Sequence, residues 1–147
     1  MPTLQRILAD DTLRKALIDD CVELIDEEVQ TKSGLSGVAI KAGYKLVKGV
    51  KPGFVADAVD SLLSPFTSAL QPIVDEAQAT KVQVSQHFID KRPVVAEALL
   101  AITDKRAENS RHKAVRAMYE KLRPAAKKHV EDAVPRVGKL LEKYAAG

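Results

Sequence analysis

The stretch from Ser33 to Phe66 constrains the fold most, because it reads as two helices joined by a tight turn. Lys51-Pro52-Gly53-Phe54 fits a type II turn, since proline presets the backbone at the second position and glycine accepts a positive φ at the third. Hydrophobic residues recur at helical spacing on both sides of this turn. They are Leu35, Val38, Ala39, Ala42, Leu46 and Val50 before it, and Phe54, Val55, Ala58, Val59, Leu62 and Leu63 after it. The pattern predicts a helical hairpin.

The first arm of this hairpin, Leu35 to Val50, is rich in small residues. Glycine inside a helix costs roughly 1 kcal/mol relative to alanine, so close packing must offset it. Ala39 and Gly43 lie four residues apart, where a missing side chain lets a neighbouring backbone approach. We therefore expect the apolar face of this arm to be buried at the centre of the protein. Gly49 is expected to end the helix in the left-handed conformation.

The residues SGLSGVAIKAGYKLVKGVKPGF, from Ser33 to Phe54, resemble a small group of uncharacterised bacterial proteins. The resemblance implies an all-helical fold. It brings no known activity and assigns no functional residue.

The composition favours an all-α fold made of a single domain, residues 1–147. Hydrophobic residues make up 46% of the chain and aromatic residues only 4%, so the core must be aliphatic and rich in alanine. Such a core suits helix-on-helix packing, and we expect a bundle of about six or seven helices around the small-residue hairpin. Ser64 and Pro65 are expected to start a new helix. Pro124 and Pro135 should bend or interrupt the C-terminal helix.

Charge is distributed unevenly along the chain, although the net charge is only +3. The segment from Asp10 to Lys32 holds eight acidic and three basic residues, whereas Lys105 to Lys143 holds twelve basic and five acidic residues. We expect these two segments to pack against each other. Alternatively, the basic end faces an anionic partner.

The sequence favours a cytoplasmic location. A single cysteine, Cys21, excludes an intramolecular disulfide and fits a reducing compartment. The longest charge-free run, residues 61–74, is shorter than the ~18 residues expected of a membrane-spanning helix. The N-terminus has no apolar segment of signal-peptide length.

No pattern of catalytic, metal-ligating or cofactor-binding residues is present. A di-iron bundle places glutamate three residues before a histidine, but His87, His112 and His129 follow Val84, Asn109 and Ala126 at that distance. Cys21 lies among acidic residues that raise the pKa of a thiol, which favours a small core residue over a nucleophile. The glycines near Gly43 and Gly49 lack the lysine and hydroxyl of a phosphate-binding loop. We therefore expect no enzymatic activity, no metal and no cofactor.

Four lysines form the first candidate binding surface. Lys41, Lys45 and Lys48 fall within about 60° on a helical wheel, and Lys51 follows in the turn. A basic amphipathic helix with a wide apolar face can lie on an anionic membrane. The alternative is that these lysines are simply the solvated side of a packed helix.

A second basic surface comes from the C-terminal third of the chain. Its residues are Arg111, Lys113, Arg116, Lys121, Arg123, Lys127 and Lys128, which could neutralise phosphates of nucleic acid without reading sequence. Base recognition or stacking needs polar and aromatic side chains presented together, and only Tyr119 is available here. This composition disfavours nucleic acid as the partner.

The function expected first is therefore non-enzymatic and works through protein contacts, with an unidentified partner or as a homo-oligomer. Peripheral binding to a membrane or lipid is the first alternative. Sequence-independent nucleic-acid binding by the basic C-terminal region is the second.

Overall fold

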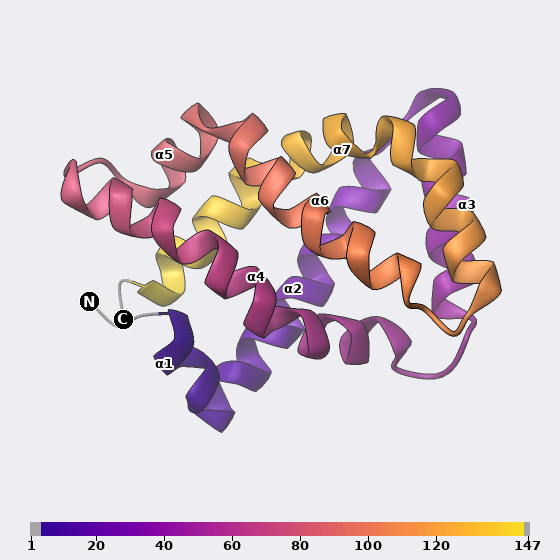
Figure 1. The fold of residues 1–147 in the computed structure, drawn as a ribbon, viewed down its shortest axis with the longest axis horizontal. Helices are drawn as coiled ribbons and strands as arrows, with labels where there is room; N and C mark the ends of the chain where they lie inside the picture. The colour runs from indigo at the N-terminus through magenta and orange to yellow at the C-terminus, as the bar shows by residue number, and fades with distance from the viewer. Residues whose placement is uncertain (1–3, 146–147) are drawn as a thin grey trace.

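A computed structural model describes residues 4–145, which form seven α-helices and no strand (Figure 1). The helices are α1 (Leu4–Ala9), α2 (Asp11–Thr31), α3 (Gly34–Lys48), α4 (Phe54–Ala79), α5 (Val84–Asp90), α6 (Arg92–Glu108) and α7 (Lys113–Ala145). They pack as a single-domain bundle, which confirms the predicted fold class and the predicted range of helix number.

The hydrophobic core lies mainly where α4, α5, α6 and α7 meet. Its most enclosed large side chains are Leu4, Val74, Phe88, Val95 and Val134. Helix α4 crosses the middle of the molecule, while α7 curves from one end over the top to the opposite lower corner (Figure 1). As the composition predicts, the interior is almost wholly aliphatic, and Phe88 is its one fully buried aromatic residue among those described.

The prolines do not divide the helices as expected. Pro65 and Pro72 lie inside the continuous helix α4, so the predicted restart at Ser64 and Pro65 is wrong. A proline inside a helix removes the hydrogen bond to the carbonyl four residues earlier. For Pro65 that carbonyl belongs to Ser61, and it accepts a hydrogen bond from Arg106 Nη2 of α6 at 3.2 Å instead. A contact between helices thus replaces the bond that the proline removes.

Pro124 and Pro135 likewise lie inside a single helix, α7. The ribbon of α7 changes direction along its length, which confirms that this helix is bent rather than broken (Figure 1). The bend lets its first half contact α3 and its second half contact α5.

The predicted turn between the two arms of the hairpin is confirmed. Gly53 has φ of +75°, and the backbone N–H of Phe54 donates to the carbonyl of Lys51 at 3.2 Å. Gly49, however, has φ of −82°, so the predicted left-handed end of α3 is wrong. The chain leaves α3 through a right-handed conformation and reverses direction only at Gly53.

The predicted burial of the α3 apolar side is also wrong. Leu35 is 94% exposed, Val38 is 67% exposed and Leu46 is 42% exposed, and no residue of α3 belongs to the hydrophobic core. The buried positions of α3 are Gly37 and Gly43. The helix packs through its small-residue side, so only the second arm, α4, runs through the core. Helical periodicity identifies an apolar side, but it does not tell which side meets a neighbour.

Opposite charges join α2 to α7, as the uneven charge distribution predicts. Arg136 pairs with Glu28 at 2.6 Å and also with Glu27, and Lys143 Nζ lies 3.2 Å from Asp20 Oδ2. The acidic segment and part of the basic segment therefore neutralise each other inside the molecule.

Candidate functional site

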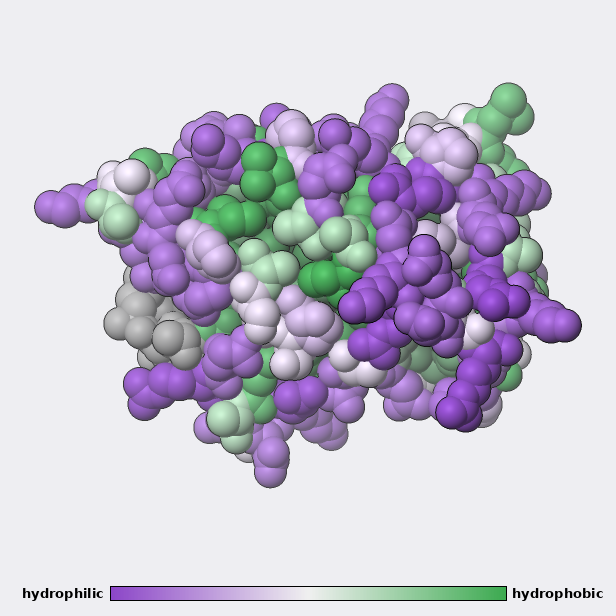
Figure 2. Space-filling model, viewed as in Figure 1, coloured by the Kyte–Doolittle hydropathy of each residue, from purple (hydrophilic) through white to green (hydrophobic). Residues whose placement is uncertain are grey.

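Helix α3 lies at one end of the molecule, beside the first half of α7 (Figure 1). Its outward side carries Leu35, Val38, Ala42 and Leu46, which we call the α3 apolar face. Three of the six large hydrophobic side chains that stay exposed within residues 4–145 belong to this face. Figure 2 shows hydrophobic atoms projecting at the corner where the chain turns from α2 into α3. Single exposed hydrophobic residues are normal, but a row of them on one helix marks an interaction surface.

Three of the four lysines predicted as a binding surface stand together beside the α3 apolar face. Lys41, Lys45 and Lys48 are exposed, and α3 contains no acidic residue. Lys48 lies 4.0 Å from Asp26, and its Nζ lies 5.2 Å from the centre of the Tyr44 ring. Within the described chain, no ion pair involves Lys41 or Lys45, so these two side chains carry the uncompensated charge.

Lys51 is separate from the other three. It lies in the turn after α3, where its Nζ is 3.3 Å from Asp57 Oδ2 of α4. Its charge is therefore partly neutralised within the hairpin. A shallow open groove lined by Ala42, Lys45, Leu46, Gly49 and Val50 runs between the turn and the α3 apolar face.

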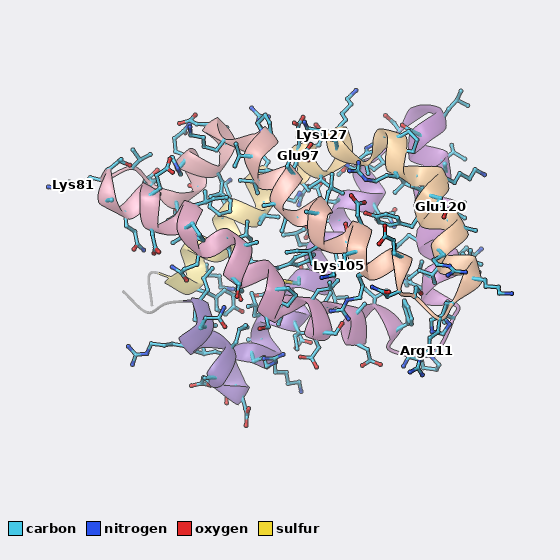
Figure 3. All side chains as sticks on the ribbon, viewed as in Figure 1. Lys81, Glu97, Lys105, Arg111, Glu120 and Lys127 are labelled. Carbon is cyan, nitrogen blue, oxygen red and sulfur yellow. The ribbon has the colours of Figure 1, made fainter. Side chains whose placement is uncertain are left out.

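The C-terminal basic residues do not form one surface. Arg123 pairs with Asp104 at 2.8 Å, and Lys127 pairs with Glu97 at 3.0 Å across α6 and α7. Figure 3 places Lys127 and Arg111 at opposite ends of the first half of α7. Lys128 is exposed and lines a polar cleft at the start of α3. Arg111, Lys113, Arg116 and Lys121 remain without an ion pair among residues 4–145.

A polar cleft of about 440 Å³ opens where the end of α2 and the start of α3 meet α7. Its lining residues are Glu28, Thr31, Lys32, Ser33, Ser36, Lys128, His129, Asp132, Pro135 and Arg136. The side chain of Lys32 is only 9% exposed, and its Nζ lies 3.3 Å from Glu28 Oε2 and donates to the His129 carbonyl at 3.3 Å. The residues of this cleft come from segments about a hundred positions apart in the sequence.

His129 is the titratable group at the centre of the cleft. Its Nε2 lies 3.2 Å from Ser36 Oγ, whereas its Nδ1 is buried without a partner among the described side chains. Burial lowers the pKa of His129 below its ordinary value of about 6.5, and the neighbouring charge of Lys32 lowers it further. Both effects favour the neutral ring over the protonated one.

The thiol of Cys21 lies away from both surfaces. Burial, followed by the charge of Asp20, raises its pKa to about 11, in the direction that its acidic neighbours predict.

Within residues 4–145, no group of three or more histidine, cysteine, aspartate or glutamate side chains is arranged to hold a metal ion.

Residues 4–145 match the model of a protein family described as a family of unknown function, DUF6918. The chain belongs to DUF6918. The match covers almost the whole chain, far more than the stretch from Ser33 to Phe54 that suggested a resemblance. No curated protein and no solved structure matches the chain.

Membership of DUF6918 brings no activity with it. The sequence predicts a surface at the lysines of α3, which are exposed, and it does not predict the polar cleft of this DUF6918 chain. The only sequence signal for the cleft was the charge asymmetry between α2 and α7, which predicted contact but not a hollow. Across the part of the chain that the structure describes, no helix has the length and hydrophobicity to cross a bilayer.

Proposed function

We propose that this protein binds reversibly, and without catalysis, to the surface of an anionic membrane through α3. The supporting observation is that the α3 apolar face is solvent-exposed while lysines stand along one side of it. An interfacial helix needs both features on one element: apolar side chains that enter the acyl boundary and basic side chains that meet the headgroups. The alternative is that the lysines are only the solvated side of a packed helix. In such a helix the apolar face would be buried, but on α3 that face is exposed.

The size of the two contributions fits reversible binding. Fully burying a leucine or valine side chain gains about 1.5–3 kcal/mol, and Leu35 and Val38 are the most exposed of the four apolar residues. Each lysine near an anionic leaflet adds about 1 kcal/mol, and neither Lys41 nor Lys45 has an ion-pair partner among residues 4–145 that it would have to leave. Association costs at least about 4 kcal/mol of translational and rotational freedom, so these few contributions give weak binding from which the protein detaches easily.

A second copy of the chain is a less suitable occupant of the same face. Two α3 helices packed face to face would bring lysines near lysines, and α3 offers no acidic side chain to neutralise them. Like charges across an interface oppose association. An anionic surface has the complementary charge, which is why a membrane is preferred here to the protein contact expected first from the sequence.

Flotation with vesicles tests the proposal. The wild-type protein should float with vesicles rich in an anionic lipid and stay at the bottom with neutral vesicles. Leu35→Asn/Val38→Asn and Lys41→Glu/Lys45→Glu should each reduce the floating fraction at least tenfold. These side chains are exposed, so the melting temperature should hardly change.

Two matched variants serve as controls. Val94→Asn removes an apolar side chain that is 55% exposed on α6, and Lys81→Glu reverses a charge at the end of the molecule opposite α3 (Figure 3). Both should float like the wild type. If no vesicle carries the wild-type protein, membrane binding is rejected. If the Leu35→Asn/Val38→Asn variant instead abolishes a dimer in sedimentation velocity, α3 is a self-association surface.

A further inference from the structure

We propose that the polar cleft between α2, α3 and α7 is a binding site for a phosphate monoester group. The cleft lies at the start of α3, separate from the lysines Lys41 and Lys45 on the outward side of that helix. It combines a positive side chain that lacks an acidic partner, hydroxyl groups from α3 and an enclosed lysine at its edge. These are the groups that bind phosphate in proteins.

Several charges of the cleft are already neutralised by ion pairs between α2 and α7. The Glu28 side chain is buried and forms two ion pairs, with Arg136 Nε at 2.6 Å and with Lys32 Nζ at 3.3 Å. Arg136 also contacts Glu27, so the Arg136 charge is fully matched by carboxylates. This set of side chains holds α2 against α7 and is structural.

One lysine of the cleft has no ion-pair partner among the described residues, and one carboxylate, that of Asp132, is held only by a long contact of 4.0 Å to Lys32. Within residues 4–145, Lys128 forms no ion pair and is exposed at the mouth of the cleft. The hydroxyl of Ser33 makes no capping hydrogen bond, which leaves it and the first N–H groups of α3 available to an acceptor. The positive end of the helix dipole adds to the charge of Lys128 at this point.

Ser36 provides a further donor through its contact with His129. A buried N–H without an acceptor is costlier than a buried ring nitrogen without a donor, and Nδ1 of His129 has no partner among the described groups. When the neutral ring carries its proton on Nε2, that nitrogen donates to Ser36 Oγ at 3.2 Å. The hydroxyl hydrogen of Ser36 is then free to point into the cleft.

Asp132 decides which anion fits. Its carboxylate is 52% exposed and lies 4.0 Å from Lys32 Nζ, at the long limit of an ion pair. An incoming anion must compete with Asp132 for Lys32. A phosphate monoester carries between 1.5 and 2 negative charges at pH 7. A carboxylate or phosphodiester carries only about one, so the monoester is the better competitor.

The monoester could belong to a lipid headgroup or to a small soluble molecule. Ser33 and Ser36 flank Leu35, so a headgroup bound in the cleft would lie at the same end of α3 as the apolar face. Only the lipid source rests on the proposed membrane function. A soluble ester would bind the cleft whether or not the protein touches a membrane.

Calorimetric titration with inorganic phosphate and with glycerol 3-phosphate tests the cleft itself. One site per chain is expected, and the variant Lys128→Ala/Ser36→Ala should weaken it at least tenfold. Lys121→Ala is the matched control, because Lys121 is an exposed lysine of the same helix outside the cleft. Absence of binding to wild type, or equal binding by both variants, overturns the proposal.

A nuclear magnetic resonance titration of His129 provides a second test. If the cleft were purely structural, phosphate would leave the titration midpoint of His129 unchanged. Bound phosphate should raise the pH at which the His129 ring titrates, since a nearby anion favours the protonated form. The same midpoint with and without saturating phosphate would contradict binding in this cleft.

Vesicles then separate the two sources. With vesicles of equal surface charge, a preference for phosphatidic acid over phosphatidylglycerol that disappears in Lys128→Ala/Ser36→Ala assigns the site to a lipid headgroup. Phosphate binding in solution without that preference assigns it to a soluble ester. If the protein binds phosphate but no vesicle, the membrane proposal fails and the cleft proposal stands.

Discussion

Gly43 of α3 faces the Met118 side chain of α7 so closely that a Cβ at Gly43 would lie 2.8 Å from Met118 Cγ and 2.9 Å from its Sδ. The small residue therefore does what its place in the sequence suggested, because it lets α3 approach a neighbouring helix. The neighbour is a side chain of α7 rather than a helix backbone. The contact also fixes which side of α3 turns inward, and so leaves the α3 apolar face outside.

The first prediction concerns this contact. Gly43→Leu should destabilise the fold by about 1–3 kcal/mol, because the added side chain forces α3 away from Met118 and Leu122. Gly49→Ala is the matched control, since Gly49 has a right-handed φ and a Cβ there would make only ordinary contacts, 3.4 Å from Leu46 O and 3.5 Å from Lys45 O. It should leave stability unchanged or raise it. Thermal melting measures both. An unchanged melting temperature for Gly43→Leu would show that α3 does not need this close approach.

The second prediction concerns Gly138, where α7 meets α5. A Cβ at this position would lie 3.0 Å from Phe88 Cβ and 3.1 Å from Ser85 Cα. Phe88 is fully buried and Ser85 presents backbone, so neither neighbour can yield as a flexible methionine can. Gly138→Ala should therefore destabilise the protein even though alanine favours helix by roughly 1 kcal/mol.

Gly43→Ala provides the comparison for Gly138→Ala. The same atom is added, but Met118 can change rotamer, so the helix-propensity gain should nearly cancel the clash. Urea unfolding of the two alanine variants measures the difference directly. Equal free energies of unfolding would show that the rigidity of the neighbour is unimportant.

These glycines also show what the sequence could and could not predict. Helical spacing predicts an all-α bundle of about six or seven helices, Pro52 and Gly53 predict the turn, and the uneven charge predicts the contact of acidic α2 with basic α7. It fails for α3 because an apolar face and a small-residue face both occur on that helix, and burial depends on which one finds a partner. The polar cleft could not be predicted, since Lys32 and His129 become neighbours only after α2 and α7 pack together.

The third prediction concerns acid. Hydrogen bonds from Arg123 and then Tyr119 lower the pKa of Asp104, and the hydrogen bond from Tyr144 lowers that of Asp20. A carboxyl whose pKa is lower in the folded state contributes stability above its unfolded pKa of about 3.9, and this is lost as pH falls below that value. Asp104→Asn should therefore lower the melting temperature clearly at pH 7 but much less at pH 3. If the difference in melting temperature between Asp104→Asn and the wild type is the same at pH 7 and pH 3, this prediction is wrong.

The fourth prediction concerns alkali. All three tyrosines donate to aspartates: Tyr44 to Asp26, Tyr119 to Asp104 and Tyr144 to Asp20. Burial is the first cause that raises the pKa of each phenol, and the adjacent carboxylate is the second. A folded pKa above the unfolded value near 10 means that stability falls as pH rises past 10. Phenolate absorbance and helical circular dichroism should therefore change together, and phenolate forming in a fully helical protein would contradict this.

The fifth prediction concerns Cys21, which packs partly buried against the core from α2. Because burial and then Asp20 raise the pKa of its thiol to about 11, little thiolate is present at pH 8. Only the thiolate attacks a disulfide reagent, so the native protein should react roughly two orders of magnitude more slowly than a free cysteine of pKa near 8.5. In denaturant, the rate should approach that of a free thiol. This control shows that the slow reaction of the native protein comes from the fold and not from damage to the cysteine. If the native and denatured proteins react at the same rate, neither burial nor Asp20 suppresses the reactivity of the Cys21 thiol, and the prediction is wrong.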